Sequence, residues 1–246
     1  IIKRAGETYT FGFGTGVDST TVLCGFTVFN HSSSMWGAIR CTSNASPTLR
    51  NLVINTLGGS AVGLMCDGAG HVRVFDSRFD TCVYGGAIRC ENYSSLTLEN
   101  TTITDCWGTK GFLCAEKSEL YLKNVQINKS TSFDNGIYLN NCPRIKMEKV
   151  TITDCDFTGP AKGIIGAKSC ESVILNRVTM TNNSLSKYPY DYENGIRRGG
   201  VWIDSGELTI LNSIIRGNTP ADIAIEAGTS PLTVNIAYSD IAGGME

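Results

Sequence analysis

The sequence predicts an all-β solenoid, a parallel β-helix of about nine coils with a period of about 24–25 residues. Two observations carry this prediction. The stretch 84–109, YGGAIRCENYSSLTLENTTITDCWGT, recurs in related form along the whole chain. Within each copy, apolar residues alternate with polar ones and are interrupted every few residues by Gly, Asn or Ser, a pattern typical of short strands. One coil cannot bury its own apolar face, so the coils must stack.

The coil at 84–109 shows the elements that we expect in every copy. A glycine pair opens a first strand, a polar corner follows, a second strand alternates, and a bend leads out of the coil. The glycine pair is Gly85 and Gly86, and the first strand contains Ile88 and Cys90. Residues 91–95 form the polar corner, the second strand contains Leu96 and Leu98, and Asn100 is at the bend.

Aligning the copies predicts two columns of inward-facing apolar side chains. The first-strand column is Ile39, Leu64, Ile88, Phe112, Ile137, Ile164, Val201 and Ile223. The second-strand column is Leu23, Leu49, Val74, Leu98, Leu122, Met147, Leu175, Ile210 and Val234.

The bend after the second strand is predicted to be structural. It is occupied by Asn51, Asp76, Asn100, Asn124 and Asn212. Asn and Asp tolerate the left-handed backbone conformation, and stacked side-chain amides can bond along the rod. On the outer face of the same strand, Glu99, Lys123 and Glu148 alternate in charge from coil to coil, as expected of a solvated face.

The outer face of the first strand is unexpectedly apolar. Its predicted outward column is Arg40, Met65, Arg89, Leu113, Tyr138, Ile165, Trp202 and Ala224. Outward positions of a solvated strand should be polar. This stripe is therefore either covered by a loop or a neighbouring chain, or it receives a ligand.

One coil carries an insertion at about residues 184–198, SLSKYPYDYENGIRR. Insertions in solenoids emerge as loops on one face, often the binding face. Aromatic rings can stack on sugar faces, so we expect a polysaccharide or cell-surface glycan as partner; the alternative is a loop that only packs over the apolar stripe. The predicted ligand-binding residues are Tyr138, Tyr188, Tyr190, Tyr192 and Trp202.

Composition limits the alternatives. The formal net charge of −2 gives no basic field for nucleic acid, and no apolar run is long enough to span a membrane. The unbroken repeat predicts one domain over residues 1–246. Neither terminal coil shows a capping segment. We therefore expect a part of a longer polypeptide, or a chain that assembles head to tail with its own copies into filaments.

Ten cysteines need an explanation. The alignment places Cys41, Cys66, Cys90 and Cys114 in one inward column and Cys82, Cys106 and Cys155 in another. They are either a ladder of buried thiols or disulfides between adjacent coils. With only two histidines and no Cys-x-x-Cys, we expect no metal site.

The motifs Gly85-Gly86-Ala87-Ile88, Leu96-x-Leu98-x-Asn100 and Tyr238-Ser239-Asp240-Ile241 resemble those of bacterial secreted right-handed parallel β-helix repeat proteins of the pectin-lyase-like superfamily. The first motif also resembles polymorphic outer-membrane protein repeats, whose partner motif Phe-x-x-Asn is absent here. The resemblance implies a single-stranded right-handed β-helix, secreted or on the cell surface. It is weak for function, because this fold carries enzymes, adhesins and scaffolds.

Enzyme motifs of that superfamily are only fragmentary. Val201-Trp202-Ile203-Asp204 resembles a pectate-lyase motif but ends in Ser205 instead of His, and Arg144-Ile145-Lys146 resembles a polygalacturonase motif without its paired aspartates. Outward carboxylates are expected to lie singly, with no facing pair. We therefore predict a non-catalytic extracellular scaffold, adhesin or glycan-binding protein without a cofactor.

The alternative is a lyase or hydrolase acting on an acidic polysaccharide, for which the resemblance implies Ca²⁺. Its candidate catalytic residues are Arg197, Arg198, Lys187, Asp204 and Glu193.

Overall fold

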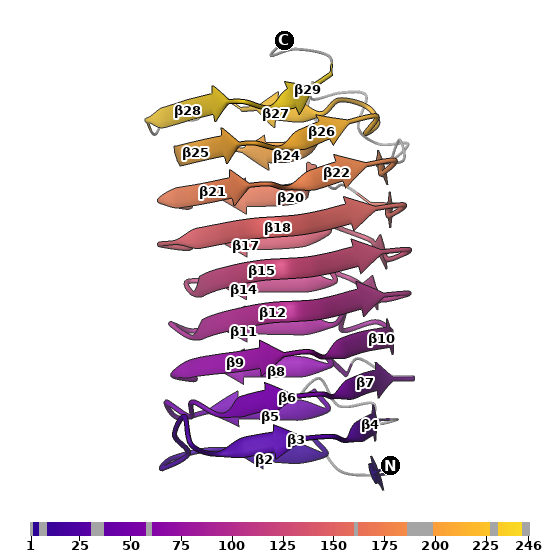
Figure 1. Cartoon of the computed structure of the whole chain (residues 1–246), viewed down its shortest axis with the longest axis vertical. Helices are drawn as coiled ribbons and strands as arrows, with labels where there is room; N and C mark the ends of the chain where they lie inside the picture. The colour runs from indigo at the N-terminus through magenta and orange to yellow at the C-terminus, as the bar shows by residue number, and fades with distance from the viewer. Residues whose placement is uncertain are drawn as a thin grey trace.

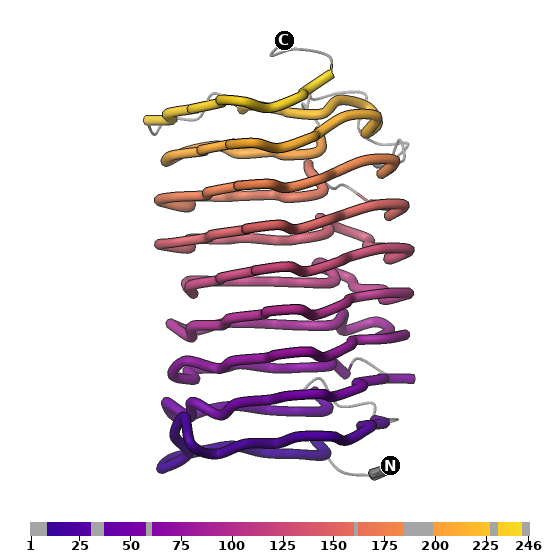
Figure 2. The backbone as a smooth tube through the Cα atoms, in the orientation of Figure 1, coloured from indigo at the N-terminus to yellow at the C-terminus, as the bar shows by residue number. Residues whose placement is uncertain are grey.

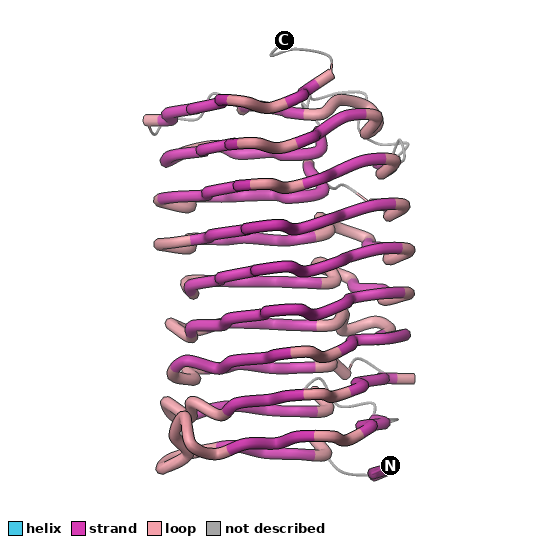
Figure 3. The backbone as a smooth tube through the Cα atoms, viewed as in Figure 1, coloured by secondary structure: helices cyan, strands magenta, loops and turns pink. Residues whose placement is uncertain are grey.

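The computed structural model of the chain is a rod of stacked β-coils, in which sequence order follows the rod from one end to the other (Figures 1 and 2). It describes residues 2–4, 9–30, 37–57, 61–159, 162–185, 199–226 and 231–242, with only the backbone of residues 2–4 and 185. These residues form strands and connecting turns without a helix (Figure 3). Consequently, no helix in these ranges could cross a membrane.

Three parallel sheets run along the rod, because each coil contributes strands that pair with the equivalent strands of the coils before and after it. The nine-stranded sheet has the order β2 (Phe11–Phe13), β5 (Ile39–Thr42), β8 (Leu64–Asp67), β11 (Ile88–Glu91), β14 (Leu113–Glu116), β17 (Ile137–Asn140), β20 (Gly163–Lys168), β24 (Gly199–Ile203) and β27 (Ile223–Ile225).

The sixteen-stranded sheet forms the opposite side of the rod. Its strands are β1 (Ile2–Arg4), β3 (Val22–Cys24), β4 (Thr27–Asn30), β6 (Thr48–Arg50), β7 (Val53–Thr56), β9 (His71–Phe75), β10 (Arg78–Cys82), β12 (Ser95–Thr104), β15 (Glu119–Asn128), β18 (Ile145–Thr153), β21 (Ser172–Asn176), β22 (Thr179–Thr181), β25 (Gly206–Leu211), β26 (Ile214–Arg216), β28 (Leu232–Ala237) and β29 (Asp240–Ile241).

A small third sheet lies at one corner of four successive coils. It contains β13 (Trp107–Gly108), β16 (Thr131–Ser132), β19 (Asp156–Phe157) and β23 (Ser184–Leu185). The predicted insertion begins in β23, and the rest of it, residues 186–198, lies outside the described residues.

The core is a set of apolar columns that run the length of the rod. Leu98 pairs in register with Val74 and Leu122, and all three side chains are fully buried. This confirms the second-strand column from Leu23 to Ile210. The predicted last member, Val234, is wrong by two positions. Ile210 pairs with Ile236, which continues the column, whereas Val234 pairs with Leu208.

The first-strand column was predicted one residue too early in two coils. Ile88 pairs with Leu113, and Ile137 pairs with Ile165. The column therefore contains Leu113 and Ile165 instead of Phe112 and Ile164, although all four side chains are buried. These coils have extra residues before the strand, and the corner absorbs them, so a comparison of sequence spacing alone misplaces the register.

The same shift corrects the outer stripe and one cysteine column. Cys114 pairs with Arg89 and Tyr138, and Gly166 pairs with Tyr138 and Trp202. The outward column is therefore Arg40, Met65, Arg89, Cys114, Tyr138, Gly166, Trp202 and Ala224. The inward cysteine column is Cys41, Cys66 and Cys90, followed by Ala115.

The bend column is confirmed in detail. Asn51, Asp76, Asn100, Asn124 and Asn212 all have φ between +50° and +52°, the left-handed region. Asn124 Nδ2 donates to Asn100 Oδ1 at 2.8 Å, and Asn100 Nδ2 donates to Asp76 Oδ1 at 3.0 Å. The predicted charge ladder beside it is also present, since Lys123 Nζ lies 2.8 Å from Glu99 Oε1.

The bend predicts a selective response to mutation. Replacing Asn124 by Val should lower the free energy of unfolding by about 1–2 kcal/mol, because a β-branched residue is strained at positive φ and cannot bond along the ladder. Asn124→Gly relieves the strain and should cost less. Urea unfolding of both variants measures the difference, and equal loss in the two would contradict a conformational role for this position.

All ten cysteines are free thiols, nine of them buried and Cys24 exposed. Of the two alternatives, the structure therefore has buried thiols and not disulfides between coils. We expect one thiol to react rapidly with a thiol reagent in the native protein and nine to react only after unfolding. Titration with and without denaturant measures this, and Cys24→Ser should remove the fast phase. Fewer than ten thiols in denaturant without reductant would contradict the free-thiol assignment.

Candidate functional site

The outer face of the nine-stranded sheet carries a hollow of about 340 Å³ at its later coils. We call it the aromatic hollow. Eight side chains line it: Asp134, Asn135, Tyr138, Lys162, Lys168, Trp202, Asp204 and Glu226. Two of these, Tyr138 and Trp202, are the described members of the predicted ligand-binding set. Tyr188, Tyr190 and Tyr192 lie outside the described residues, so their predicted approach to Trp202 stays a prediction.

A glycine allows the Asn135 side chain to lie between the two aromatic residues. Tyr138 and Trp202 occupy the same column two coils apart, roughly 10 Å, with Gly166 on the strand between them. Any Cβ at position 166 would clash with the Asn135 side-chain amide, which lies against this glycine. Gly166 therefore makes room for the Asn135 side chain, which lies between the two aromatic residues and forms part of the lining of the hollow.

Asn135 fixes the wall of the hollow. Its Oδ1 accepts hydrogen bonds from the backbone N–H groups of Lys162 and Gly163, at 3.2 and 3.0 Å. Its Nδ2 donates to Asp134 Oδ1 at 3.0 Å. Since Asn135 is only 5% exposed, these bonds hold the chain that enters β20 against the chain that enters β17. The position of Lys162 follows from this link.

Lys162 covers the indole of Trp202. Its Nζ lies 4.4 Å from the ring centroid and 2.8 Å from Glu226 Oε2. Trp202 Nε1 donates to the same Glu226 oxygen at 2.9 Å. Trp202 is consequently only 4% exposed, although it faces outward. The outer stripe is thus partly buried by its own charged neighbours, in addition to any cover from elsewhere.

The three carboxylates of the hollow differ in their partners and in their burial. The hydrogen bond from Lys162 holds the pKa of Glu226 below its ordinary value. Burial raises the pKa of Asp134. Asp204 Oδ1 accepts from the Ser169 N–H at 2.7 Å and from Ser205 Oγ at 2.9 Å. Burial, assisted by Glu116, raises the pKa of Tyr138 to about 12, so its hydroxyl remains a neutral donor.

The expectation that outward carboxylates lie singly is wrong here, because Asp134, Asp204 and Glu226 line one hollow. Lys168 and Asp204 follow directly after the in-register residues Ala167 and Ile203, and Glu226 follows Ile225, the partner of Ile203. Lys168, Asp204 and Glu226 therefore occupy the same position in successive coils, and the repeat in the sequence could have predicted that they lie together. Asp134, Asn135 and Lys162 come from the corners between strands, where the repeat is irregular. Of the other lyase candidates, Arg197, Arg198, Lys187 and Glu193 lie outside the described residues.

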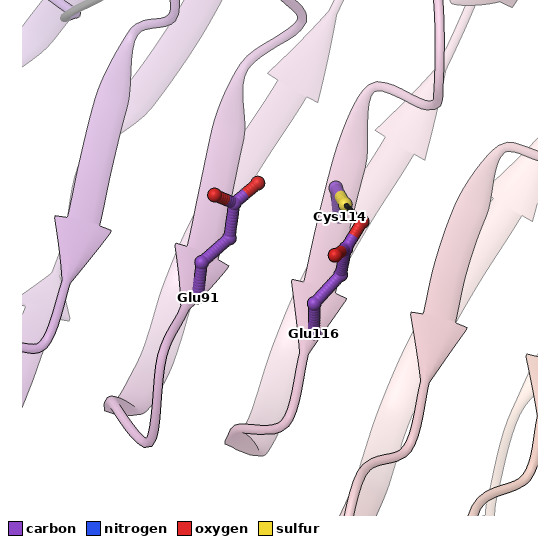
Figure 4. A group of neighbouring side chains, drawn as sticks. All are labelled: Glu91, Cys114 and Glu116. Carbon is purple, nitrogen blue, oxygen red and sulfur yellow. Dashed lines mark hydrogen bonds between the residues drawn. The ribbon is translucent and has the colours of Figure 1, made fainter.

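A second cluster, Glu91, Cys114 and Glu116, brings two carboxylates and a thiol within 4.8 Å of one another on β11 and β14 (Figure 4). Each carboxylate already has a cation, since Arg89 lies 3.3 Å from Glu91 and Lys110 lies 3.1 Å from Glu116. Burial, and then Glu116, raise the pKa of the Cys114 thiol. A protonated thiol and two neutralised carboxylates are poor ligands for a cation.

The family is decided by comparison with known sequences. The model of the family described as right handed beta helix region matches residues 15–184, well over half of the chain. The chain belongs to this family. Neither the curated proteins nor the solved structures contain a match to it. The predicted right-handed parallel β-helix is therefore confirmed, and membership by itself assigns no ligand or reaction.

The contacts of Lys162 predict a measurable coupling. Lys162→Met keeps an unbranched side chain over Trp202 but removes the ammonium group, so the pKa of Glu226 should rise toward its ordinary value. Carboxyl carbon NMR during a pH titration measures this. Lys123→Met, on the opposite sheet, is the matched control and should leave Glu226 unchanged. An unchanged Glu226 in Lys162→Met would contradict the ion pair.

Proposed function

We propose that this protein is a non-catalytic extracellular β-helix that binds a glycan in the aromatic hollow. The observation that supports this most directly is the lining of the hollow, in which the aromatic side chains of Tyr138 and Trp202 lie on either side of the Asn135 amide. Binding sites for small ligands combine apolar or aromatic walls with a few oriented polar groups. The aromatic hollow has both, because carboxylates, amides and lysines surround the two rings.

The chemistry suits a sugar better than an apolar ligand. Sugar rings offer C–H faces to aromatic side chains and hydroxyl groups to carboxylates and amides. Asp134 and Asp204 are half-buried acceptors, Lys168 is an exposed donor, and Tyr138 keeps its proton. Lys162 covers Trp202, so a sugar would contact Tyr138 first and reach the indole only if Lys162 turns aside.

The rod shape fits a scaffold or adhesin role. Successive coils repeat at about 4.8 Å, so a rigid column of side chains can follow an extended polymer along the rod axis. A location outside the cell or on its surface and head-to-tail assembly belong to the same proposal. Their support is the repeat architecture alone.

The enzyme alternative has one observation in its favour. Three carboxylates line the hollow, and burial raises the pKa of one of them, Asp134, as is typical of a general acid. A glycosidase needs two carboxyl groups on opposite sides of one bond. Asp204 and Glu226, however, are already bonded to Ser169 and to Lys162, which favours a binding role for both.

Removal of the half-buried Tyr138 side chain tests glycan binding. In a glycan array, the intact protein should retain specific oligosaccharides, and Tyr138→Ala should weaken their binding by about tenfold or more, corresponding to at least about 1.4 kcal/mol. Tyr93→Ala, which removes an 83% exposed tyrosine, should bind like the parent. Absence of any retained glycan, or equal binding by Tyr138→Ala, would contradict the proposal.

The same preparations separate binding from catalysis. Any bound oligosaccharide should be recovered intact after prolonged incubation, by mass spectrometry. Cleavage that is lost in Asp134→Asn would replace the binding proposal by the hydrolase alternative, and an unsaturated product would indicate a lyase.

A further inference from the structure

A second hollow, of about 400 Å³, lies on the outer face of the sixteen-stranded sheet, where β9, β12, β15 and β18 begin. Figure 1 shows these strands in neighbouring coils. The hollow exists because β12 contributes the short side chains Ser95 and Thr97, between His71 on β9 and Tyr121 on β15. We call it the basic hollow. It lies on a different sheet from the aromatic hollow.

Positive side chains surround the basic hollow. The cations Arg144 and Lys146, at the start of β18, line it together with the His71 imidazole and a single carboxylate, Glu119. Arg73 adds a further guanidinium beside Thr97, with which it pairs in register. The chain as a whole has a formal net charge of −2, so this group of cations departs locally from the overall balance.

Two of these donors have no partner among the described residues. The buried Nε–H of Arg73 donates to no hydrogen-bond acceptor among the described residues. The Arg144 guanidinium is exposed and forms no ion pair within the described ranges. Lys146 lies 3.6 Å from Glu148, and its Nζ is 5.2 Å from the ring centroid of Tyr121. Glu148 is shared, since it also accepts from the Tyr121 hydroxyl at 3.2 Å.

His71 completes the donor set. Its Nε2 lies 2.8 Å from Thr97 Oγ1 at the floor of the hollow. Burial, and then the Arg73 charge, lower the pKa of His71, and Glu119 opposes them. The charged groups that face this imidazole are therefore Arg73 and Glu119, with Arg144 and Lys146 across the hollow.

We propose that the basic hollow binds the tetrahedral oxyanion of a sulfate or phosphate ester. Its donors come from different coils and from two side-chain columns, so they can surround a group with three or four oxygens. A planar carboxylate offers two oxygens and matches one bidentate guanidinium. Tyr121 provides a ring against which the organic part of the ester can pack. This site does not depend on glycan binding in the aromatic hollow.

NMR of the single imidazole tests this proposal. His31→Gln leaves His71 as the only histidine. A pH titration is recorded in sodium sulfate and in sodium chloride at equal ionic strength. Sulfate should raise the pKa of His71, because a bound anion favours the protonated ring. The Arg144→Gln/Lys146→Gln variant should lose this difference. Lys123→Gln removes one charge from the same face, outside the hollow, and should retain it.

Two results would overturn the proposal. One is a His71 that titrates at the same pH in both salts, and the other is a sulfate-dependent shift that survives in Arg144→Gln/Lys146→Gln. A sulfated monosaccharide and a sugar phosphate then identify the source of the oxyanion, and the correct ester should bind more tightly than its inorganic ion. If neither ester does so, the ester part of the proposal is wrong.

Discussion

The structure depends on the in-register stacking of one coil on the next. Each strand completes its hydrogen bonds only with the equivalent strands of adjacent coils, and each apolar side chain is buried by its counterparts above and below. Leu98, for example, is fully buried only because Val74 and Leu122 continue its column. Every other feature, from the bend ladder to the two hollows, is a consequence of side chains repeating at one strand spacing.

Stacking also explains how a regular scaffold produces irregular sites. A column of similar side chains gives a flat surface, and a hollow appears where one coil contributes a smaller residue. Ser95 and Thr97 open the basic hollow in this way, and Gly166 makes room for the Asn135 amide that lines the aromatic hollow. The neighbouring coils then provide walls whose spacing is fixed by the backbone ladder. Hollows on this fold can therefore arise through single small residues that leave the core intact.

The two hollows differ in how their charges are balanced. In the aromatic hollow, the charge of Glu226 is paired with Lys162, and Glu226 also accepts from the Trp202 N–H. In the basic hollow, the exposed Arg144 guanidinium forms no ion pair with any described residue, and Arg73 beside the hollow has an unpaired Nε. Paired charges orient side chains around a neutral ligand, whereas unpaired donors favour a charged one. The two faces of one rod are thus suited to different chemistry.

The sequence by itself determined the solenoid, the bend column and most core columns, because the strand period and the preference of Asn for positive φ are local properties. It also identified Tyr138 and Trp202 as outward aromatic residues. Only the tertiary structure decided which residues share a coil position where corners vary in length, as with Leu113 in place of Phe112 and Gly166 in place of Ile165. It alone brought Asp134, Lys162 and Glu226 to one hollow. The physical reason is that a corner can absorb an extra residue at little cost, so spacing along the chain does not fix the register between coils.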